Sequence, residues 1–485
     1  MSDEKDFIIK QQCRIIKEQQ MQIEELNKLV AELQATIKTL REQLNKNSGN
    51  SSKPPSTDGF KKVINKNQSL RKNTGKKAGG QKGHKGSCLI VPAEPNNTEE
   101  HPHADCKFCP HYEECHETAI VKETRYVIDA VVKVDITAHS VLSIEKCMIN
   151  GREKTGSFPN AVKSHIQYGK NLEALAVTLN TVGAVSVNRT HEILSGVFNI
   201  PISTGTISDM VSRCSDKIKY PLDIIVSKLK ESSIAHADET GMNINGKLNW
   251  AHSVSNDKYT YITLHTKRGY DAIKDIGILL EYKGTLVHDC WSAYWKLDGI
   301  SHQLCCAHLL RELNGIAENN PEQKWVLKFK EFLLKMKKAV SKAIESNKEA
   351  LSNSTLSRYS KMYAEIIKLA YEENPEPEVK QKQRGRRKRG KILSLIDRLF
   401  EHKGEVCLFL HNFKVPFDNN QAERDIRNIK IKTKVSGFFK TEEGAKNYLN
   451  IMSFVGTAKK HGYSAYEAIR LAVIGNPETI FGCTE

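Results

Sequence analysis

The stretch IAHADETGMNINGKLNWAHSVSNDKYTYITLH, residues 234–265, decides the fold of the central part of the chain. Its alternating and β-branched residues predict three strands, at 234–244, 248–254 and 259–265. Asn245-Gly246 separates the first two strands, and this dipeptide is the strongest short signal for a tight hairpin. A polar turn leads into the third strand. The stretch therefore predicts an antiparallel meander.

A helix and a further strand are predicted directly after the meander, at 270–282 and 285–288. Three antiparallel strands, a helix and a parallel strand give the element order of a ribonuclease H-like fold. In that arrangement Asp238 in the first strand and Asp289 after the fourth come together at the edge of the sheet. Carboxylate oxygens suit Mg²⁺, which usually retains waters for substrate phosphates. The strand order thus predicts a divalent metal site at these two residues.

A third carboxylate is needed to hold two ions about 4 Å apart, and Glu423 is the candidate. It lies in NNQAERDIR, residues 419–427, where Asn420 is expected to cap a helix. That helix would carry Glu423 and Arg427 on one face, with Lys430 two turns beyond Glu423 to grip a DNA phosphate. The alternatives are structural. A strand aspartate is often a turn residue, and a glutamate in a basic helix often forms an intrahelical ion pair.

The bulk composition favours an anionic partner. The chain has 485 residues, enough for roughly three to four structural units. Its formal charge is +16 and its isoelectric point is near 9.1, a balance that is typical of nucleic-acid-binding proteins but is shared by membrane-surface proteins. The first residues have no apolar signal core, and no apolar stretch is long enough to cross a bilayer. We therefore expect a cytoplasmic protein without a membrane partner.

Residues 1–46 predict a coiled coil, or leucine zipper. β-branched residues at one heptad position and Leu at the other favour a parallel dimer, which predicts a homo-oligomer. The alternative is an amphipathic helix that packs on its own chain. The first position holds Ile9, Ile16, Ile23, Val30, Ile37 and Leu44, and the second holds Leu26, Leu33 and Leu40. Residues 47–100 follow as a basic flexible linker, which is solvated or tracks DNA phosphates.

Residues 101–160 contain cysteines with the spacing of a structural zinc site. The first two form a C-x-x-C pair, and the last returns after two expected strands, at 125–136 and 140–147. Asn150 stands where a thiol would complete a second C-x-x-C, which leaves the fourth ligand open. Incidental reduced cysteines are the alternative. The predicted Zn²⁺ ligands are Cys106, Cys109, Cys115 and Cys147, with His111 and His116 as alternatives to Cys115.

The remaining segments are expected to be helical. Residues 161–230 predict several short helices, and the helix at 203–218 begins with a Ser/Thr-rich cap. Together these helices form either a helix-turn-helix or a packing unit without DNA contacts. Residues 301–404 predict a helical insertion with an apolar stripe that indicates packing. Its basic run, 380–391, is a solvated loop or a contact to the DNA backbone. Residues 451–485 predict a C-terminal helical element.

Six motifs together resemble the transposases of the insertion-sequence 66 family, and they span almost the whole chain. Their order is specific, because few unrelated proteins would share it. The motifs are NSSKPPS at 50–56, GGQKGH at 79–84, HADET at 236–240, HDCWSAY at 288–294, CAHLLR at 306–311 and NNQAER at 419–424.

The resemblance implies a multidomain α+β protein of the DDE transposase type. Its ribonuclease H-like α/β catalytic core, at 231–300 and 405–450, is interrupted by the helical insertion and preceded by the coiled coil, the zinc-binding segment and the helix-turn-helix region. Two Mg²⁺ or Mn²⁺ ions would support hydrolysis at the ends of a bacterial insertion sequence and joining of the 3′ hydroxyl to target DNA. The implied metal ligands are Asp238, Asp289 and Glu423, and the expected DNA-binding residues are Lys430, Arg424, Arg427, His308 and Arg311.

The incomplete second C-x-x-C departs from the family pattern. The resemblance also implies small accessory proteins of the same element as partners and a nucleoid-associated protein in the bacterial cytoplasm. Two alternatives stay open, a non-catalytic zinc-containing DNA-binding protein and a related nuclease that cuts without joining. The adjacent thiols of Cys305 and Cys306, with His308, are expected to pack rather than to bind a further metal.

Overall fold

The computed structural model describes residues 2–46, 50, 97–127, 133–145, 147–149, 152–376 and 389–482. They belong to two compact units, and each is described by itself. The larger unit comprises 1–64, 164–194 and 201–485, and the smaller comprises 65–163 and 195–200. The motif at 79–84, the motif at 50–56 beyond Asn50, and the basic run up to residue 388 lie outside the described residues.

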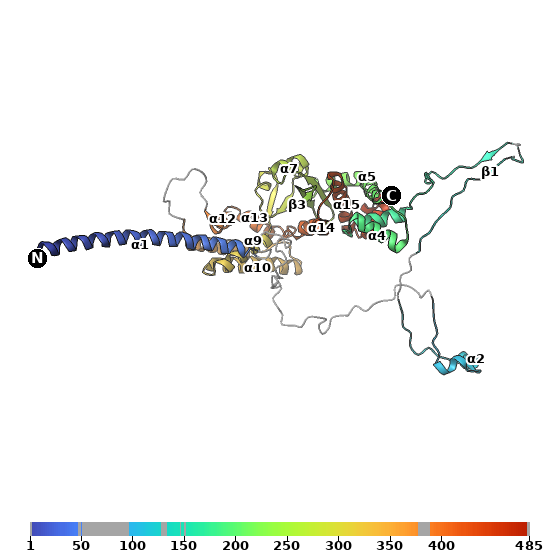
Figure 1. Cartoon of the computed structure of the whole chain (residues 1–485), viewed down its shortest axis with the longest axis horizontal. Helices are drawn as coiled ribbons and strands as arrows, with labels where there is room; N and C mark the ends of the chain where they lie inside the picture. The colour runs from blue at the N-terminus through green and yellow to red at the C-terminus, as the bar shows by residue number, and fades with distance from the viewer. Residues whose placement is uncertain are drawn as a thin grey trace. The chain divides into compact units, whose positions relative to one another are not determined.

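A five-stranded mixed sheet forms the centre of the larger unit (Figure 1). The order is β5-β4-β3-β6-β7, with β3, β4 and β5 antiparallel and β6 and β7 parallel to β3. Asn245 and Gly246 have φ angles of 46° and 77°, the left-handed pair that a two-residue hairpin turn requires. The predicted meander and fourth strand are confirmed. The strands are β3 Ile234–Ile244, β4 Lys247–Ser255, β5 Thr260–His265, β6 Thr285–His288 and β7 Ser301–Leu304.

Two details predicted for this region are wrong. The helix expected at 270–282 is divided into α7, Tyr270–Ile276, and α8, Ile278–Glu281, because Gly277 between them has a left-handed φ of 80°. The first four residues of the expected helical insertion form the strand β7, Ser301–Leu304. Their polar sequence carries no strand pattern, and the strand forms through parallel pairing with β6. Sheet formation here depends on a partner that lies outside the local sequence.

Two C-terminal helices hold the sheet. α14, Asn420–Ser436, packs on β3 and β4, and α15, Glu442–Lys460, lies along β5 (Figure 1). The hydroxyls of Ser453 and Thr457 accept hydrogen bonds from N–H groups of β5 at 2.8 and 3.0 Å. The helix thereby satisfies donors that an open sheet edge would leave unpaired. The shared core contains Met242, Ile244, Ala251, Ile262, Ile426, Ile429, Tyr448, Leu449 and Met452.

Helices make up most of the rest of the larger unit. The segment predicted as several short helices contains four of them, and Ser203 caps α5 by accepting a hydrogen bond from the Thr206 N–H. The helices of this segment are α3 Lys170–Asn180, α4 Val187–Phe198, α5 Thr204–Lys217 and α6 Lys219–Lys230. Those that follow β7 are α9 Cys306–Asn319, α10 Lys324–Glu345, α11 Asn353–Glu373, α12 Gly390–Glu401 and α13 Lys403–His411, and α16 Ala465–Ile474 comes after α15.

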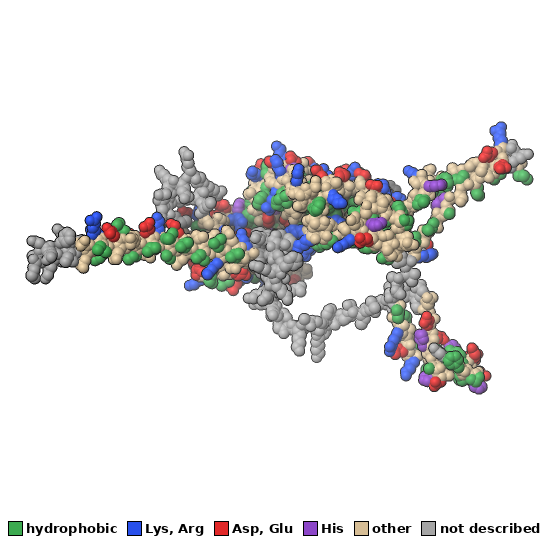
Figure 2. Space-filling view, in the orientation of Figure 1, with side chains coloured by type: hydrophobic (Ala, Val, Ile, Leu, Met, Phe, Trp, Pro, Cys, Tyr) green, Lys and Arg blue, Asp and Glu red, His purple; other side chains and the backbone are tan. Residues whose placement is uncertain are grey.

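The apolar stripe predicted for the insertion is a packing surface. Its residues are Trp325, Phe329, Phe332, Met336, Val340 and Ile344. The first five are buried in a core shared by α9 to α13, and Ile344 is about half exposed. α1, Ser2–Leu44, differs from these helices, because its heptad residues such as Ile23 are about half exposed. Figure 2 shows hydrophobic side chains along the surface of this helix. A long helix with an exposed apolar stripe is typical of a chain that pairs with a second helix.

The smaller unit contains short elements in its described residues. Residues 125–127 and 133–136 are not in a strand, so the strand expected at 125–136 is wrong there, and 128–132 lie outside the described residues. The strand expected at 140–147 is reduced to β1. Among the described residues 97–163 no apolar side chain is buried, and Val127, for example, is 94% exposed. The elements are η2 Ala104–Phe108, α2 Tyr112–Glu117, β1 Ser143–Ile144 and β2 Lys154–Thr155.

In the described part of the chain, no helix is both long enough and apolar enough to cross a membrane.

Candidate active site

The parallel pairing of β3 with β6 aligns two aspartates. His236 lies opposite Val287, and Asp238 and Asp289 each follow two residues later. They therefore hold equivalent positions on neighbouring strands, at the point where the pairing of these strands ends. Both side chains are half-buried. The sheet thus brings together the two residues that the strand order predicted at one edge.

The turn after β6 fixes the direction of Asp289. Cys290 has a φ of 70°. Positive φ angles are uncommon for residues other than glycine, and such strained residues occur most often at functional sites. The Asp289 carboxylate accepts a hydrogen bond from the Trp291 N–H at 3.1 Å, and the Cys290 N–H donates to Nδ1 of His288 at 3.2 Å. These contacts hold the turn in its strained conformation.

α14 carries Glu423 to the same place. Burial raises the pKa of Asp238 well above its usual value, and the negative charges of Glu239, Asp289 and Glu423 raise it further. Lys430 lies close as well: burial lowers the pKa of its ammonium group, and the charges of Asp238 and Glu423 oppose that shift. Three predicted carboxylates and the predicted lysine therefore share one electrostatic neighbourhood.

α9 supplies the partners of Glu423. A guanidinium nitrogen of Arg311 lies 3.2 Å from both carboxylate oxygens, and Nε2 of His308 lies 3.7 Å from one of them. His308 also accepts a hydrogen bond from Arg311 at 3.2 Å. The two α9 residues expected to bind DNA are thus in contact with the third carboxylate.

A mixed group of ligand atoms forms around the same glutamate. The donor atoms of Cys305, His308 and Glu423 lie within 4.8 Å of one another, and no other group of three or more His, Cys, Asp or Glu donors in the described chain meets that limit. Cys306, which was considered with them, is buried elsewhere, with its sulfur 3.6 Å from the Val406 carbonyl oxygen. The Cys305 sulfur already accepts a hydrogen bond from the Asn419 N–H, and burial raises the pKa of its thiol to about 12, which fits the packing role expected for it rather than metal binding.

The start of α14 corrects one prediction. Asn419, not Asn420, is the N-cap residue, and its side chain is turned toward β3. Asn419 Oδ1 accepts a hydrogen bond from His236 Nδ1, and Asn419 Nδ2 donates to the Ala237 carbonyl oxygen, both at 2.8 Å. The long-range contact prevails over a local cap because Ala237 lies just beyond the end of the β3–β6 pairing and needs a donor.

Two neighbours of Asp238, Glu239 and Arg268, were not predicted. Glu239 is buried next to Asp238, where its carboxylate accepts hydrogen bonds from Arg268 Nε and from the Tyr294 hydroxyl, both at 2.7 Å. The Arg268 guanidinium lies 3.7 Å from the ring centroid of Trp291. The available sequence signal was the second acidic residue in HADET, because a charge in a buried strand requires a partner. Nothing in the sequence pattern identified Arg268 as that partner.

The two arginines of α14 are exposed. Arg424 donates to Gln421 at 2.8 Å, and Arg427 lies near enough to Lys430 for its charge to lower the lysine pKa. Arg427 lies one helical turn after Glu423, as its spacing in the sequence predicts.

The cysteines of the smaller unit are not gathered. Cys106 and Cys109 flank a turn in which the Cys109 N–H donates to the Cys106 carbonyl oxygen at 3.1 Å. Within 97–127, 133–145 and 147–149, Cys115 and Cys147 do not join them in a group of donors within 4.8 Å. The short turn is compatible with a zinc knuckle, and the ligand set remains a prediction.

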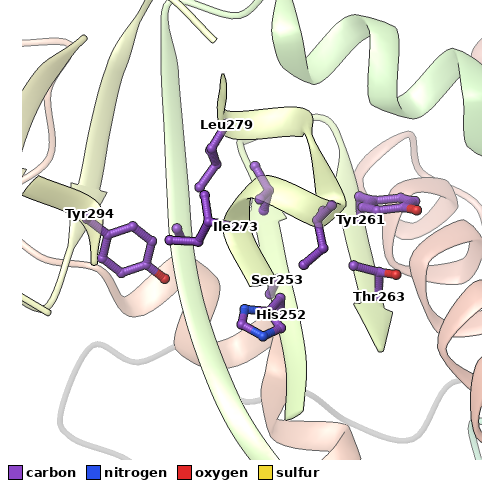
Figure 3. Close-up of a pocket in the computed structure, with 10 residues that line it drawn as sticks. His252, Ser253, Tyr261, Thr263, Ile273, Leu279 and Tyr294 are labelled. Carbon is purple, nitrogen blue, oxygen red and sulfur yellow. The ribbon is translucent and has the colours of Figure 1, made fainter. Parts of the chain in front are cut away.

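A small pocket lies between the sheet and α7 (Figure 3). Ile273 and Leu279 point into it from the helices, while His252 and Tyr261 line it from the strands. Tyr294 at its border directs its hydroxyl to Glu239. Because its lining is largely apolar and includes none of the three carboxylates, this pocket belongs to the packing beneath the site.

Comparison with protein families gives two matches. The model of the transposase IS66 family matches residues 165–447, and a family of unknown function matches residues 9–89. No curated protein matches the chain. The first match covers more than half of the 485 residues and includes all three carboxylates. The protein therefore belongs to the transposase IS66 family, whose role is that of a DNA-processing enzyme that moves a mobile element.

Proposed function

We propose that this transposase cuts DNA at the ends of a bacterial insertion sequence and joins the freed 3′ hydroxyl to target DNA, with Asp238, Asp289 and Glu423 as a DDE triad. The observation that carries the proposal is the β3–β6 register, which aligns Asp238 with Asp289. Glu423, on α14, is close enough for its charge to raise the pKa of Asp238, and both carboxylates act on Lys430. The strand order and directions support a ribonuclease H-like core, because three antiparallel strands are followed by two parallel ones.

The residues at this place fit divalent ions with a preference for oxygen. Asp238 is surrounded by like charges that raise its pKa, and a cation would offset that repulsion. The three carboxylates do not all lie within 4.8 Å of one another. This wider spacing of the three carboxylates suits two ions about 4 Å apart, because two ions need ligands spread over a larger distance than one ion does. When bound, two Mg²⁺ or Mn²⁺ ions would activate the attacking hydroxyl and stabilise the leaving oxygen.

The side chains around the triad would hold the DNA. The negative charges of Asp238 and Glu423 both act on Lys430, so its ammonium group lies near the metal site. From there it would bind the phosphate next to the cleaved bond. Arg427 and Arg424 are exposed on the same helix and would bind neighbouring phosphates. Arg311 holds the Glu423 carboxylate and adds a positive charge to this rim. His308 touches the same carboxylate, and burial lowers its pKa, which favours the neutral ring. The protein positions the reacting groups and forms no covalent intermediate in this scheme.

The other segments would pair subunits and recognise DNA. The exposed stripe of α1 supports a coiled coil between two copies, and α3 to α5 would act as the helix-turn-helix. Zn²⁺ held by Cys106, Cys109, Cys115 and Cys147 would order the smaller unit. Accessory proteins of the same element are further expected partners.

Cleavage of labelled element-end DNA by the full chain tests the proposal. We expect Mg²⁺-dependent nicking and strand-joining products from the parent protein and neither from Asp238→Asn. Parent protein that binds element ends but never cuts them would support the non-catalytic reading. Cutting without joined products would support a nuclease.

A further inference from the structure

We infer that Asn419 and Cys305 form a buried pair that sets the spacing of the three carboxylates, which makes Asn419 a positioning residue of the site. This inference rests on the proposed metal-binding triad. Neither residue touches the reacting DNA in the proposal. Each residue acts by holding the backbone next to a residue whose carboxylate binds metal in the proposal.

Asn419 connects α14 to β3. Its side chain is 1% exposed and makes two hydrogen bonds at 2.8 Å, one from His236 Nδ1 and one to the Ala237 carbonyl oxygen. Because the amide oxygen can only accept, Nδ1 of His236 must carry the proton. Ala237 directly precedes Asp238, so the amide of Asn419 fixes the peptide from which the first aspartate projects.

Cys305 connects the same asparagine to β6. Its sulfur is buried and accepts a hydrogen bond from the Asn419 N–H at 3.1 Å. Its own N–H donates to the His288 carbonyl oxygen at 2.8 Å, and His288 directly precedes Asp289. The pair thus reaches the residue before each aspartate.

The position of Asn419 at the start of α14 also determines where Glu423 lies. The Glu423 N–H donates to the Asn419 carbonyl oxygen at 3.3 Å, which places Glu423 one helical turn after the pair. A displacement of Asn419 would therefore move Glu423 relative to both aspartates. No other contact pair named above reaches all three carboxylate-bearing segments.

The Asn419 side chain bonds to the strand that carries Asp238 rather than to its own helix. An N-cap asparagine ordinarily uses its side chain on the helix itself, and here the side chain serves β3 instead. The neighbouring Asn420 is half-buried, and no described residue is hydrogen-bonded to its side chain. Asn420 therefore offers a matched control of the same type, one position along the chain.

The experiment measures Mn²⁺ binding to the full-length chain by calorimetry, without DNA, for the parent, Asn419→Ala, Asn420→Ala and Asp238→Asn. We expect Asn419→Ala to weaken Mn²⁺ binding about 10- to 100-fold, as the loss of an outer contact to metal ligands typically does. Asn420→Ala should bind as the parent does. In cleavage assays, Asn419→Ala should raise the half-saturating Mg²⁺ concentration more than it lowers the maximal rate.

A second pair of variants covers the case in which Asn419→Ala does not fold. Cys305→Ser retains an acceptor for the Asn419 N–H and should bind Mn²⁺ nearly as the parent does, whereas Cys305→Ala should weaken binding several-fold. Parent-like Mn²⁺ binding by folded Asn419→Ala, or by Cys305→Ala when the former does not fold, would overturn the inference. If Asp238→Asn also binds as the parent does, the proposed metal site itself is wrong.

Discussion

The sheet at residues 234–288 and the cysteine segment at 101–160 differ in what holds them together. The sheet buries apolar side chains against α14 and α15 and satisfies its edge with helix hydroxyls. The cysteine segment exposes Val127, Ile136 and Met148 almost completely. A segment whose described residues bury no apolar side chain needs another source of order, and the spacing of its cysteines in the sequence predicts a metal. Metal ions would therefore serve chemistry in the first region and folding in the second.

Removal of zinc should give the largest effect, and only in the cysteine segment. Structural zinc contributes about 10 kcal/mol or more to the folding of small metal-dependent domains. We expect a chelator to make residues 101–160 sensitive to protease while the fragment that contains the sheet stays resistant, as mass spectrometry of the digest would show. Added Zn²⁺ should restore protection. Equal protection with and without the chelator would contradict a zinc-dependent segment.

Asp289→Asn should remove activity and leave the sheet folded. Loss of metal-assisted charge stabilisation worth about 4 kcal/mol lowers the rate about 10³-fold. Single-turnover cleavage of element-end DNA measures the rate, and circular dichroism checks the fold. The exposed Asp298 lies in the following loop, and Asp298→Asn serves as the control, with parent-like cleavage expected. A rate for Asp289→Asn within threefold of the parent would be incompatible with the triad.

The pH dependence of stability should reveal the crowded carboxylates. Burial and neighbouring charges raise the folded-state pKa of Asp238 above its usual 3.8. A raised carboxyl pKa gives stability that is fully present below the unfolded value and is lost as pH rises through the folded value. Without metal, Asp238→Asn should therefore gain melting temperature relative to the parent as pH increases from 4 to about 8. Added Mg²⁺ should reduce this difference, and a difference that does not change with pH would argue against the crowding.

The hairpin turn should give the smallest effect. Gly246 has a φ of 77°, and a Cβ added to it would meet open space, so Gly246→Ala carries only the backbone penalty of about 1 kcal/mol. Gly205→Ala, in α5, should stabilise slightly because its Cβ would lie 3.5 Å from Ser203 Oγ, an ordinary contact. Melting temperatures of both variants test this. Equal stability of Gly246→Ala and the parent would show that the turn does not hold the sheet.

Local patterns predicted the elements of the sheet, and long-range contacts account for what they missed. β3 has the predicted bounds because alternation and Asn245-Gly246 are local signals. β7 could not be predicted, since its polar residues become a strand only beside β6. The side chain of Asn419 was not expected to leave its helix for β3, because that bond joins residues 182 positions apart.

The candidate site divides in the same way. Asp238 and Asp289 followed from strand order, and the register of β3 with β6 aligns them. Glu423 was inferred from its motif and from its spacing to Lys430, and both side chains now lie in the electrostatic neighbourhood of Asp238. Arg268 and Glu239 were missed, because a buried ion pair between a strand and a distant loop leaves no periodic pattern in the sequence.

The central claim is that Asp238, Asp289 and Glu423 hold two ions at once, and electron paramagnetic resonance of the full-length protein with Mn²⁺ and element-end DNA tests it most directly. Two ions about 4 Å apart should give a spin-coupled spectrum in the parent protein. Glu423→Gln should reduce it to the spectrum of isolated Mn²⁺. An uncoupled spectrum from parent protein that is actively cutting DNA would contradict the two-ion site.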